Sequence, residues 1–325
     1  MELECEGHAL PCHQFRTLVD EERIAAAVIV RTTYDWHGED LILQDEPAWP
    51  VSPGPFDSPQ GPHPGDDLWL HEGVDCLLFG HARAPGGTPC ESVEVAVKIG
   101  TWERRVRVLG ERVWEKGWGK RLLPSPPQPF TAVPLGLSSA FGGSYDLHGL
   151  PVPYGDNPDG VGFVPDAKAA VGAQLPQLEE IDRPISEWAL EMPVVGLGLC
   201  PPAFSSRFER GASFTDDGVL SELRPAFFNH AFPEMVAPGA APGDVVQVTG
   251  VDAAGDRRFV VPELPVRVEL SFGDTTTVKP LAVDQIGIEP DQNRVFITWR
   301  YPFRYTIRPM EPRRLVLRAC HEGDS

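Results

Sequence analysis

Four side chains that could exchange protons or hold a cation lie in one irregular stretch, residues 138–163. They are Asp146, His148, Asp156 and Asp159. Carboxylates beside an imidazole can act as general acid and base, or can share a divalent cation. The spacing lacks the Asp/Asn ladder and closing Glu of an EF-hand loop. Turn formation is the alternative that we favour, because Asp and Asn side chains hydrogen-bond their own backbone and an Asp-Asn-Pro sequence initiates turns.

A second group with the chemistry of a metal site lies near the N-terminus and comprises Cys5, His8, Cys12 and His13. Zinc takes four thiolate or imidazole ligands in tetrahedral geometry. The group lacks paired C-x-x-C spacing, so we expect a weakly ordered segment over residues 1–23 and no bound metal. Zinc binding at this group is kept as the open alternative. The six cysteines are scattered, and we expect free thiols.

Motifs for nucleophilic catalysis or phosphate binding are missing from the sequence. No serine lies in a GxSxG elbow, and there is no GxxxxGK[ST] loop. Trp102, Trp114, Trp118 and Trp299 could line a carbohydrate-binding platform, but tryptophan on strands more often fills a core. We therefore expect a protein that is not an enzyme and that needs no cofactor.

The charge balance narrows the class of partner. Of the 325 residues, 28 are Lys or Arg and 47 are Asp or Glu, which gives a net charge of -19. Such a chain is a poor match for nucleic acid or for an anionic membrane, whose binding depends on basic side chains, and it suits a basic protein partner. The N-terminus lacks an apolar signal region, and no apolar run is long enough to span a bilayer. We therefore expect a cytoplasmic protein.

Short strands must position these residues. Val93, Val95, Val97 and Ile99 alternate with other residues, and the chain returns over 102–109 after a Gly-Thr turn, which predicts a β-hairpin. Further strands are predicted at 24–36 (with a helical alternative in its first half), 245–251, 257–261, 266–272, 275–281, 283–288 and 294–301, and short helices at 165–174 and 186–192. With 35 Pro and 32 Gly, the pattern predicts a mainly β fold: an antiparallel β-sandwich or open barrel with long Gly/Pro-rich loops and a few short helices.

Three regions are expected along the chain. The weakly ordered segment ends at residue 23, one β domain covers 24–301, and an extension covers 302–325. The β domain has the option of two packed halves joined by a loop and helix segment at 164–205.

Glycine, phenylalanine and asparagine residues indicate an architectural role for the 138–163 stretch. We expect Phe141 and Phe163 to anchor its ends in a core, and Asn157 and Asn229 to be buried amides that hold irregular backbone. We expect its glycines to lie where φ is positive or where no side chain fits. The glycines in question are Gly142, Gly143, Gly160 and Gly162.

Six sequence segments occur in one order and carry a family resemblance. They are GHARAPGG (80–87), VAVKIGTWERRVRVLGERVW (95–114), PFTAVPLGLSSAFGG (129–143), DNPDGVGF (156–163), PAFFNHA (225–231) and VFITWR (295–300). Together they resemble bacterial domain-of-unknown-function family 2169 over roughly residues 25–301. The Cys- and His-rich N-terminus and the segment 164–205 depart from the family pattern.

The resemblance implies a function, because this family is encoded beside type VI secretion spike proteins and toxic effectors. It implies a non-enzymatic adaptor or chaperone that binds a cognate effector and helps to load it onto the spike, with the spike protein as a second partner. The alternative is a carbohydrate-binding or hydrolytic β-sandwich protein that uses the 138–163 loop. The residues expected to form a structural signature and a candidate partner-binding surface are Phe141, Gly142, Gly143, Asp156, Asn157, Pro158, Gly160, Gly162, Phe163, Phe228 and Asn229.

Overall fold

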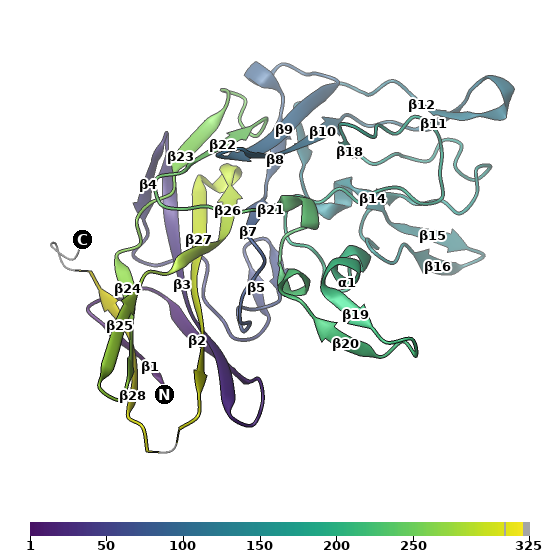
Figure 1. Ribbon diagram of the computed structural model, residues 1–325. Helices are drawn as coiled ribbons and strands as arrows, with labels where there is room; N and C mark the ends of the chain where they lie inside the picture. The colour runs from purple at the N-terminus through teal and green to yellow at the C-terminus, as the bar shows by residue number, and fades with distance from the viewer. Residues whose placement is uncertain (309, 321–325) are drawn as a thin grey trace.

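The computed structural model describes residues 1–308 and 310–320 and shows a mainly β protein (Figure 1). Within these residues α1 (Ser205–Gly211) is the only α-helix. Six short 3-10 helices accompany it: η1 (Pro85–Gly87), η2 (Trp118–Lys120), η3 (Leu137–Ser139), η4 (Pro225–Phe228), η5 (Pro233–Met235) and η6 (Pro290–Gln292). The prediction of a mainly β fold with long loops and few short helices is confirmed.

The largest sheet has seven strands in the order β2-β3-β27-β26-β7-β21, with β4 paired to β3. Its strands are β2 (Cys12–Leu18), β3 (Arg23–His37), β4 (Asp40–Leu43), β7 (Val74–Leu78), β21 (Val236–Ala237), β26 (Ala282–Glu289) and β27 (Arg294–Thr306). The middle of β3 is buried on both faces, which explains why its sequence lacks a polar alternation. The predicted strand at 24–36 is therefore confirmed over its helical alternative. The strands β7 and β26 pair in parallel, so this sheet is mixed.

A five-stranded sheet has the order β18-β10-β9-β22-β23. It comprises β9 (Ser92–Ile99), β10 (Trp102–Leu109), β18 (Leu178–Glu180), β22 (Val245–Thr249) and β23 (Arg257–Val260). The predicted hairpin is confirmed, since β9 and β10 pair along their whole length and Gly100 turns the chain with a φ of +57°. The valines of β9 face the core, whereas Glu94 pairs with Arg105 on the exposed face.

A four-stranded sheet contains the first and the last strand of the chain, side by side (Figure 1). In the order β1-β28-β24-β25, its strands are β1 (Leu3–Glu6), β28 (Arg313–Ala319), β24 (Val266–Phe272) and β25 (Thr275–Lys279). The sequence predicts a weakly ordered segment at 1–23, but β1 pairs in parallel with β28 and β2 pairs with β3. The partner of β1 lies at the far end of the sequence, so local composition does not reveal it. The predicted extension at 302–325 supplies the end of β27 and all of β28, and residues 309 and 321–325 lie outside the described residues.

Six two-stranded pairs complete the described strands. They are β5 (Phe56–Ser58) with β6 (Gly61–His63), β8 (His81–Arg83) with β13 (Ala132–Pro134), β11 (Trp114–Lys116) with β12 (Leu122–Pro124), β14 (Phe141–Gly142) with β17 (Val161–Gly162), β15 (Ser144–Leu147) with β16 (Leu150–Pro153), and β19 (Ala212–Phe214) with β20 (Leu220–Leu223). Among the described strands no sheet closes into a barrel.

The predicted helices at 165–174 and 186–192 are wrong, because both segments are turns and irregular backbone. In the first segment, Gly172 N–H donates to Trp114 O (2.8 Å) and Trp114 N–H donates to Ala173 O (3.0 Å). These backbone groups therefore bond to β11 rather than to a helical turn of their own. The second segment packs its tryptophan against a small core. Tertiary contacts override helix propensity in both places.

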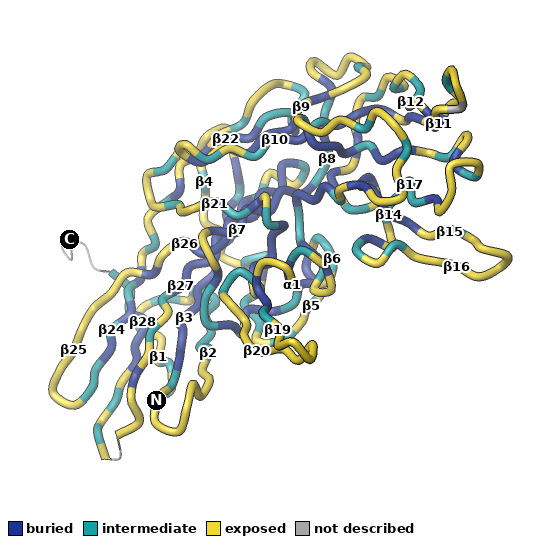
Figure 2. The backbone as a smooth tube through the Cα atoms, turned by 45° about the vertical axis from the view of Figure 1, so that its right-hand side comes forward, coloured by how far each residue is buried: buried dark blue, intermediate teal, exposed yellow. Residues whose placement is uncertain are grey.

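Two apolar cores lie beneath the sheets. The larger core takes side chains from all three main sheets, for example Val95, Leu270 and Ile286. The smaller core lies under the 138–163 stretch and comprises Trp114, Leu122, Phe141, Val164, Ala170, Leu175 and Met192. Figure 2 shows buried backbone running through the main sheets, with exposed hairpins projecting from it.

Candidate functional site

The two ends of the 138–163 stretch meet in the short parallel pair of β14 and β17. Phe141 at the start is almost fully buried and Phe163 at the end is half-buried against the small core, as predicted. Tyr154 packs between them, with ring centroids 5.0 Å from Phe141 and 5.3 Å from Phe163. The stretch is thus a closed loop held by its own aromatic side chains.

Asn157 is the buried amide that holds this loop, and the prediction of that role is confirmed. The residue is 1% exposed. Its Nδ2 donates to Leu137 O and Phe141 O, both at 2.9 Å, and its backbone oxygen accepts from Gly143 N–H at 2.8 Å. The side chain therefore satisfies carbonyl groups that the irregular backbone leaves without strand partners. Pro158, which follows, is exposed in the turn.

The four glycines lie where the sequence predicts. Gly142, Gly143 and Gly162 have φ of +148°, +98° and +102°, a region that other residues rarely adopt. Gly160 has an ordinary φ, but a Cβ there would lie 2.7 Å from Ala140 O. Each glycine is thus required by backbone conformation or by close backbone approach.

Two of the four acid–base candidates in the loop, Asp146 and Asp156, make separate local contacts. Asp146 Oδ1 accepts from Gly149 N–H (2.7 Å), which closes a turn. Asp156 accepts from Ser205 N–H (2.9 Å) and Ser205 Oγ (2.6 Å), which ties the loop to the start of α1. Within the described residues, no hydrogen bond joins any two of the four acid–base candidates. These contacts therefore do not support the carbohydrate-binding or hydrolytic alternative.

Asn229, like Asn157, is a buried amide whose side chain hydrogen-bonds to irregular backbone, here at the loop before β7. Its Oδ1 accepts from Glu72 N–H (3.2 Å), and its Nδ2 donates to Glu72 O (2.9 Å) and to Asp75 Oδ1 (2.7 Å). Phe228 beside it is partly exposed and contacts the ring of Phe227, which in turn packs on Phe208 of α1. The prediction of a buried amide at Asn229 is confirmed.

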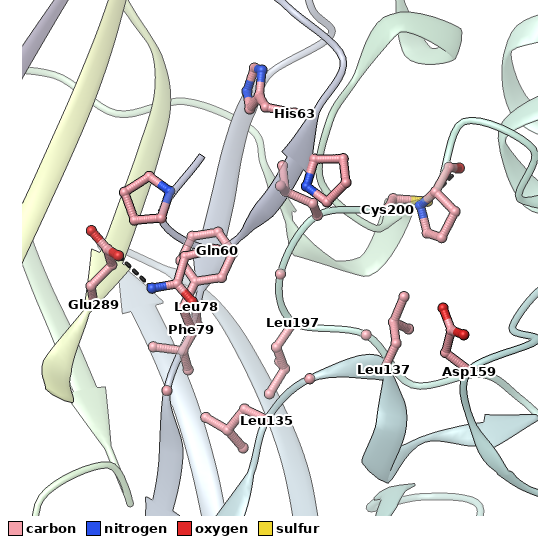
Figure 3. Close-up of a pocket in the computed structure, with 18 of the residues that line it drawn as sticks. Gln60, His63, Leu78, Phe79, Leu135, Leu137, Asp159, Leu197, Cys200 and Glu289 are labelled. Carbon is pink, nitrogen blue, oxygen red and sulfur yellow. Dashed lines mark hydrogen bonds between the residues drawn. The ribbon is translucent and has the colours of Figure 1, made fainter. Parts of the chain in front are cut away.

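A cleft of about 880 Å³ lies beside the loop (Figure 3). Asp159 of the loop and Leu137, just before the loop, form part of its wall, and Leu135, Leu197 and His63 lie opposite or beside them. The other lining residues are Pro55, Pro59, Gln60, Pro62, Pro64, Leu78, Phe79, Gly80, His81, Gly136, Gly196, Gly198, Leu199, Cys200, Pro201, Pro202, Glu289, Asp291 and Gln292. Leucine, proline and glycine dominate this lining, so the cleft suits an apolar or extended segment.

Most charged groups at the cleft are already paired. Buried Glu289 bonds to Arg294 (2.5 Å) and accepts from Trp49 Nε1 (2.8 Å). Asp291 bonds to His81 (2.6 Å) and Arg83 (2.7 Å). Partial burial raises the pKa of Asp291, but the hydrogen bonds from Arg83 and His81 outweigh it and hold that pKa below its usual value. Asp159 is therefore the exposed carboxylate left to meet a ligand.

Burial also keeps the imidazole of His63, one of two histidines that line the cleft, uncharged. Burial, helped by the positive charge of Arg31, lowers the pKa of His63 to about 3. The ring of His63 lies 4.6 Å, centroid to centroid, from that of His230 in the interior. His63 thus connects the cleft to a cluster of buried polar residues.

Three hairpins project from the side of the molecule away from the two chain ends: β11–β12, β15–β16 and β19–β20 (Figures 1 and 2). All three carry exposed apolar side chains. Trp118 beside β11 is 98% exposed, Leu150 of β16 is 69% exposed, and Phe214 of β19 is 52% exposed. We call this set the hairpin surface; it also includes Leu147, Val152, Val219, Leu220 and Leu223.

The four N-terminal candidates for zinc do not converge. Cys5 Sγ and Cys12 Sγ lie 2.9 Å apart, but His13 Nε2 bonds to Asp67 (3.0 Å) and His8 Nε2 lies 3.2 Å from Leu317 O. Burial and the neighbouring Cys5 thiol raise the pKa of Cys12 to about 12. The thiols therefore form a pair, and the imidazoles serve other contacts.

Sequence reasoning missed the buried residues His71, Asp75, His230 and Asp284. The structure brings them together from the loop before β7, from β7, from the loop after η4 and from β26. The only local signal is the spacing of His71 and Asp75, which is common in sequences. The other two residues are far apart in the chain.

The fold and the site together define a mainly β protein whose recognisable features are a cleft and exposed apolar hairpins. The family model for an uncharacterized protein conserved in bacteria (DUF2169) matches residues 21–300. The chain therefore belongs to this bacterial family. Neither the curated proteins nor the solved structures include a match to it. In the part of the chain that the structure describes, no helix has the length and apolar character needed to cross a membrane.

Proposed function

We propose that the protein is a non-enzymatic cytoplasmic adaptor that binds a cognate toxic effector and helps to load it onto a type VI secretion spike. The observation that carries the proposal is the hairpin surface. The sequence resemblance of this chain to a family encoded beside such effectors also supports the proposal. The mechanism is binding through a preformed surface.

Exposed apolar side chains on projecting hairpins favour contact with another protein. Single exposed apolar residues are ordinary, but contiguous or clustered ones mark interaction sites. Burying such side chains contributes about 25 cal/mol per Å² of apolar surface. A specific interface of ordinary size buries about 1,600 Å² in total, which is more than one hairpin can supply. Several hairpins on one side of the molecule fit this requirement.

The charge of the β19–β20 hairpin favours a basic partner. The β19–β20 hairpin carries the exposed residues Asp216, Asp217 and Glu222. The chain as a whole has a net charge of -19. Complementary charge raises the association rate and discriminates against wrong partners. A basic effector or spike segment with exposed apolar residues therefore fits best.

An edge strand offers a second mode of contact. All five residues of β25 are exposed, and the strand lies at the end of its sheet. Such an edge can accept a strand from a partner through backbone hydrogen bonds. This mode is independent of the hairpin surface.

Co-purification with the effector encoded beside the gene tests the proposal. Phe214→Ser removes an exposed apolar residue of the hairpin surface, and Ile42→Ser removes one of similar exposure from β4, away from the hairpins (Figure 1). We expect Phe214→Ser to weaken effector binding by about tenfold or more, as for an interface hot spot, and Ile42→Ser to bind as wild type. Effector binding that is equal for both variants and wild type would contradict a role for this surface.

A further inference from the structure

A cluster of buried histidine and aspartate side chains lies beside the parallel pair of β7 and β26. We call His71, Asp75, His230 and Asp284 the histidine–aspartate cluster. Each comes from a different segment, and every side chain is more than nine-tenths buried. Buried ionisable groups are costly unless they are paired or bind a metal. The cluster therefore needs a physical explanation.

Three of the four side chains lie close enough together to share one ion, and the fourth contacts one of them. One ligand atom each from His71, Asp75 and His230 lies within 4.8 Å of the other two. His71 Nδ1 is 3.1 Å from Asp284 Oδ2 and 3.7 Å from Asp75 Oδ2. Tetrahedral zinc holds nitrogen and oxygen ligands at about 2.0–2.2 Å, which places neighbouring ligand atoms roughly 3.3 Å apart. The distances from His71 Nδ1 to the oxygens of Asp284 and Asp75 lie on either side of that value.

A β-bulge directs the fourth side chain into the cluster. The register between β26 and β27 shifts between Val283 and Gln285, so the backbone of Asp284 has no opposite residue on β27. Bulges re-aim a side chain and often do so next to functional sites. Asp284 therefore points toward His71 instead of continuing the alternation of the strand.

The buried imidazole of His71 has a ring nitrogen without a partner. Its side chain is 1% exposed; Nδ1 faces Asp284 Oδ2 at 3.1 Å, outside hydrogen-bond geometry, and Nε2 has no partner among the described residues. A buried polar atom left without a partner costs about 1–3 kcal/mol. Such an atom in a native fold indicates a missing ligand, ion or water. This is the observation, independent of the spacing, that points to a bound species.

The surrounding groups hold the cluster as an outer shell holds metal ligands. Asp75 accepts from Asn229 Nδ2 (2.7 Å) and from His230 N–H (2.6 Å). Asp284 accepts from Arg300 Nε (3.0 Å). Oriented carboxylates and neutral imidazoles are the donors that transition metals take.

The charge around the cluster restricts which ion fits. Arg300 lies against Asp284, and Arg207 donates to Asn229 O at the edge of the cluster. These positive charges oppose any bound cation, zinc included, so only an ion that bonds strongly to its ligands would be held. Calcium and magnesium prefer shells of oxygen ligands, whereas zinc and related ions form strong bonds to imidazole. A zinc-type ion is therefore the best match.

We propose that His71, Asp75, His230 and Asp284 form a closed structural site for a zinc-type transition-metal ion. The ion joins the loop before β7 and the loop after η4 to strand β26. It would thus fix the base of the segment that carries α1 and the β19–β20 hairpin. This inference departs from the sequence-based expectation of no metal site, and it does not depend on the proposed adaptor function.

Metal analysis of the full-length protein tests the site. The protein is purified from zinc-supplemented culture, desalted and assayed for zinc, and its melting temperature is measured before and after chelator treatment. We expect about one zinc per chain and a lower melting temperature without it. Less than about one tenth of an equivalent, with a melting temperature unaffected by added zinc, would overturn the proposal.

Matched variants locate the ion. His71→Gln should lose the zinc, whereas His63→Gln, which changes a neighbouring buried imidazole outside the ligand set, should keep it. The double variant Cys5→Ser, Cys12→Ser should also keep it. Loss of zinc in the cysteine variant would overturn the site. Should His71→Gln fail to fold, X-ray absorption of the wild-type zinc protein decides, since nitrogen and oxygen scatterers alone support the site and sulfur contradicts it.

Discussion

Replacing Asn157 with alanine is the sharpest test of how the 138–163 loop keeps its shape. The substitution leaves the backbone unchanged and removes one amide that is 1% exposed. It deletes the two hydrogen bonds from Nδ2 to Leu137 O and Phe141 O. No charge and no large apolar group is lost, so the effect reports these hydrogen bonds directly.

The expected loss of stability depends on whether each of the two carbonyl groups keeps another hydrogen-bond donor. Leu137 O still accepts from Ala140 N–H (3.1 Å), so its loss is that of an ordinary hydrogen bond, about 1 kcal/mol. Phe141 O loses the donor that satisfies it in the interior, which costs about 1–3 kcal/mol. We therefore expect Asn157→Ala to lower the free energy of unfolding by about 2–4 kcal/mol.

Urea unfolding followed by tryptophan fluorescence measures this change, because Trp114 lies in the small core beneath the loop. Asp146→Ala in the same loop is the control. Asp146 is exposed and closes a single turn, so its loss should change the free energy of unfolding by less than about 0.5 kcal/mol. An Asn157→Ala protein within about 0.5 kcal/mol of wild type would refute the architectural reasoning.

Three further outcomes are expected. Gly162→Val should fold poorly or lose solubility, because the backbone there has a φ of +102°; a soluble variant with the wild-type unfolding midpoint would show that the loop tolerates a side chain. The folded-state pKa of Asp291 is below its unfolded value, so this carboxylate stabilises the fold at neutral pH and that contribution is lost as the pH falls below about 4. Asp291→Asn should therefore be less stable than wild type at pH 7 by urea unfolding, with the difference shrinking in acid; a pH-independent difference would contradict the pairing with His81. Cys5 and Cys12 should join in a disulfide on treatment with a mild thiol oxidant, seen as a mass decrease equal to two hydrogen atoms, and two free thiols after treatment would contradict the geometry.

The sequence predicts the fold where apolar residues alternate with period two. The 93–109 hairpin and the strands after residue 245 follow this rule, and the structure confirms them. Prediction from the sequence fails where the strand that a segment pairs with is distant in the chain, as for β1 with β28. It also fails at 165–174, where helix-favouring composition yields to backbone bonds with Trp114.

The key residues of the 138–163 loop can be predicted from the sequence, whereas those of the histidine–aspartate cluster cannot. Asn157 and the glycines of the loop are recognisable because turn chemistry requires those residue types locally. His71 and His230 are not recognisable, because they meet only where the loop after η4 bonds to β7, as His230 N–H does to Asp75; the fourth residue, Asp284, arrives through the parallel pairing of β7 with β26 and through the bulge. Nothing in the linear spacing of these residues encodes those features.

Delivery of the neighbouring effector by a strain that lacks this gene tests the adaptor proposal most directly. The strain is complemented with wild type, with Phe214→Ser or with Ile42→Ser, and secretion of the tube protein is followed in parallel. We predict that deletion abolishes delivery of that effector while tube secretion continues, and that wild type and Ile42→Ser restore delivery but Phe214→Ser does not. Undiminished effector delivery in the deletion strain would contradict the proposal.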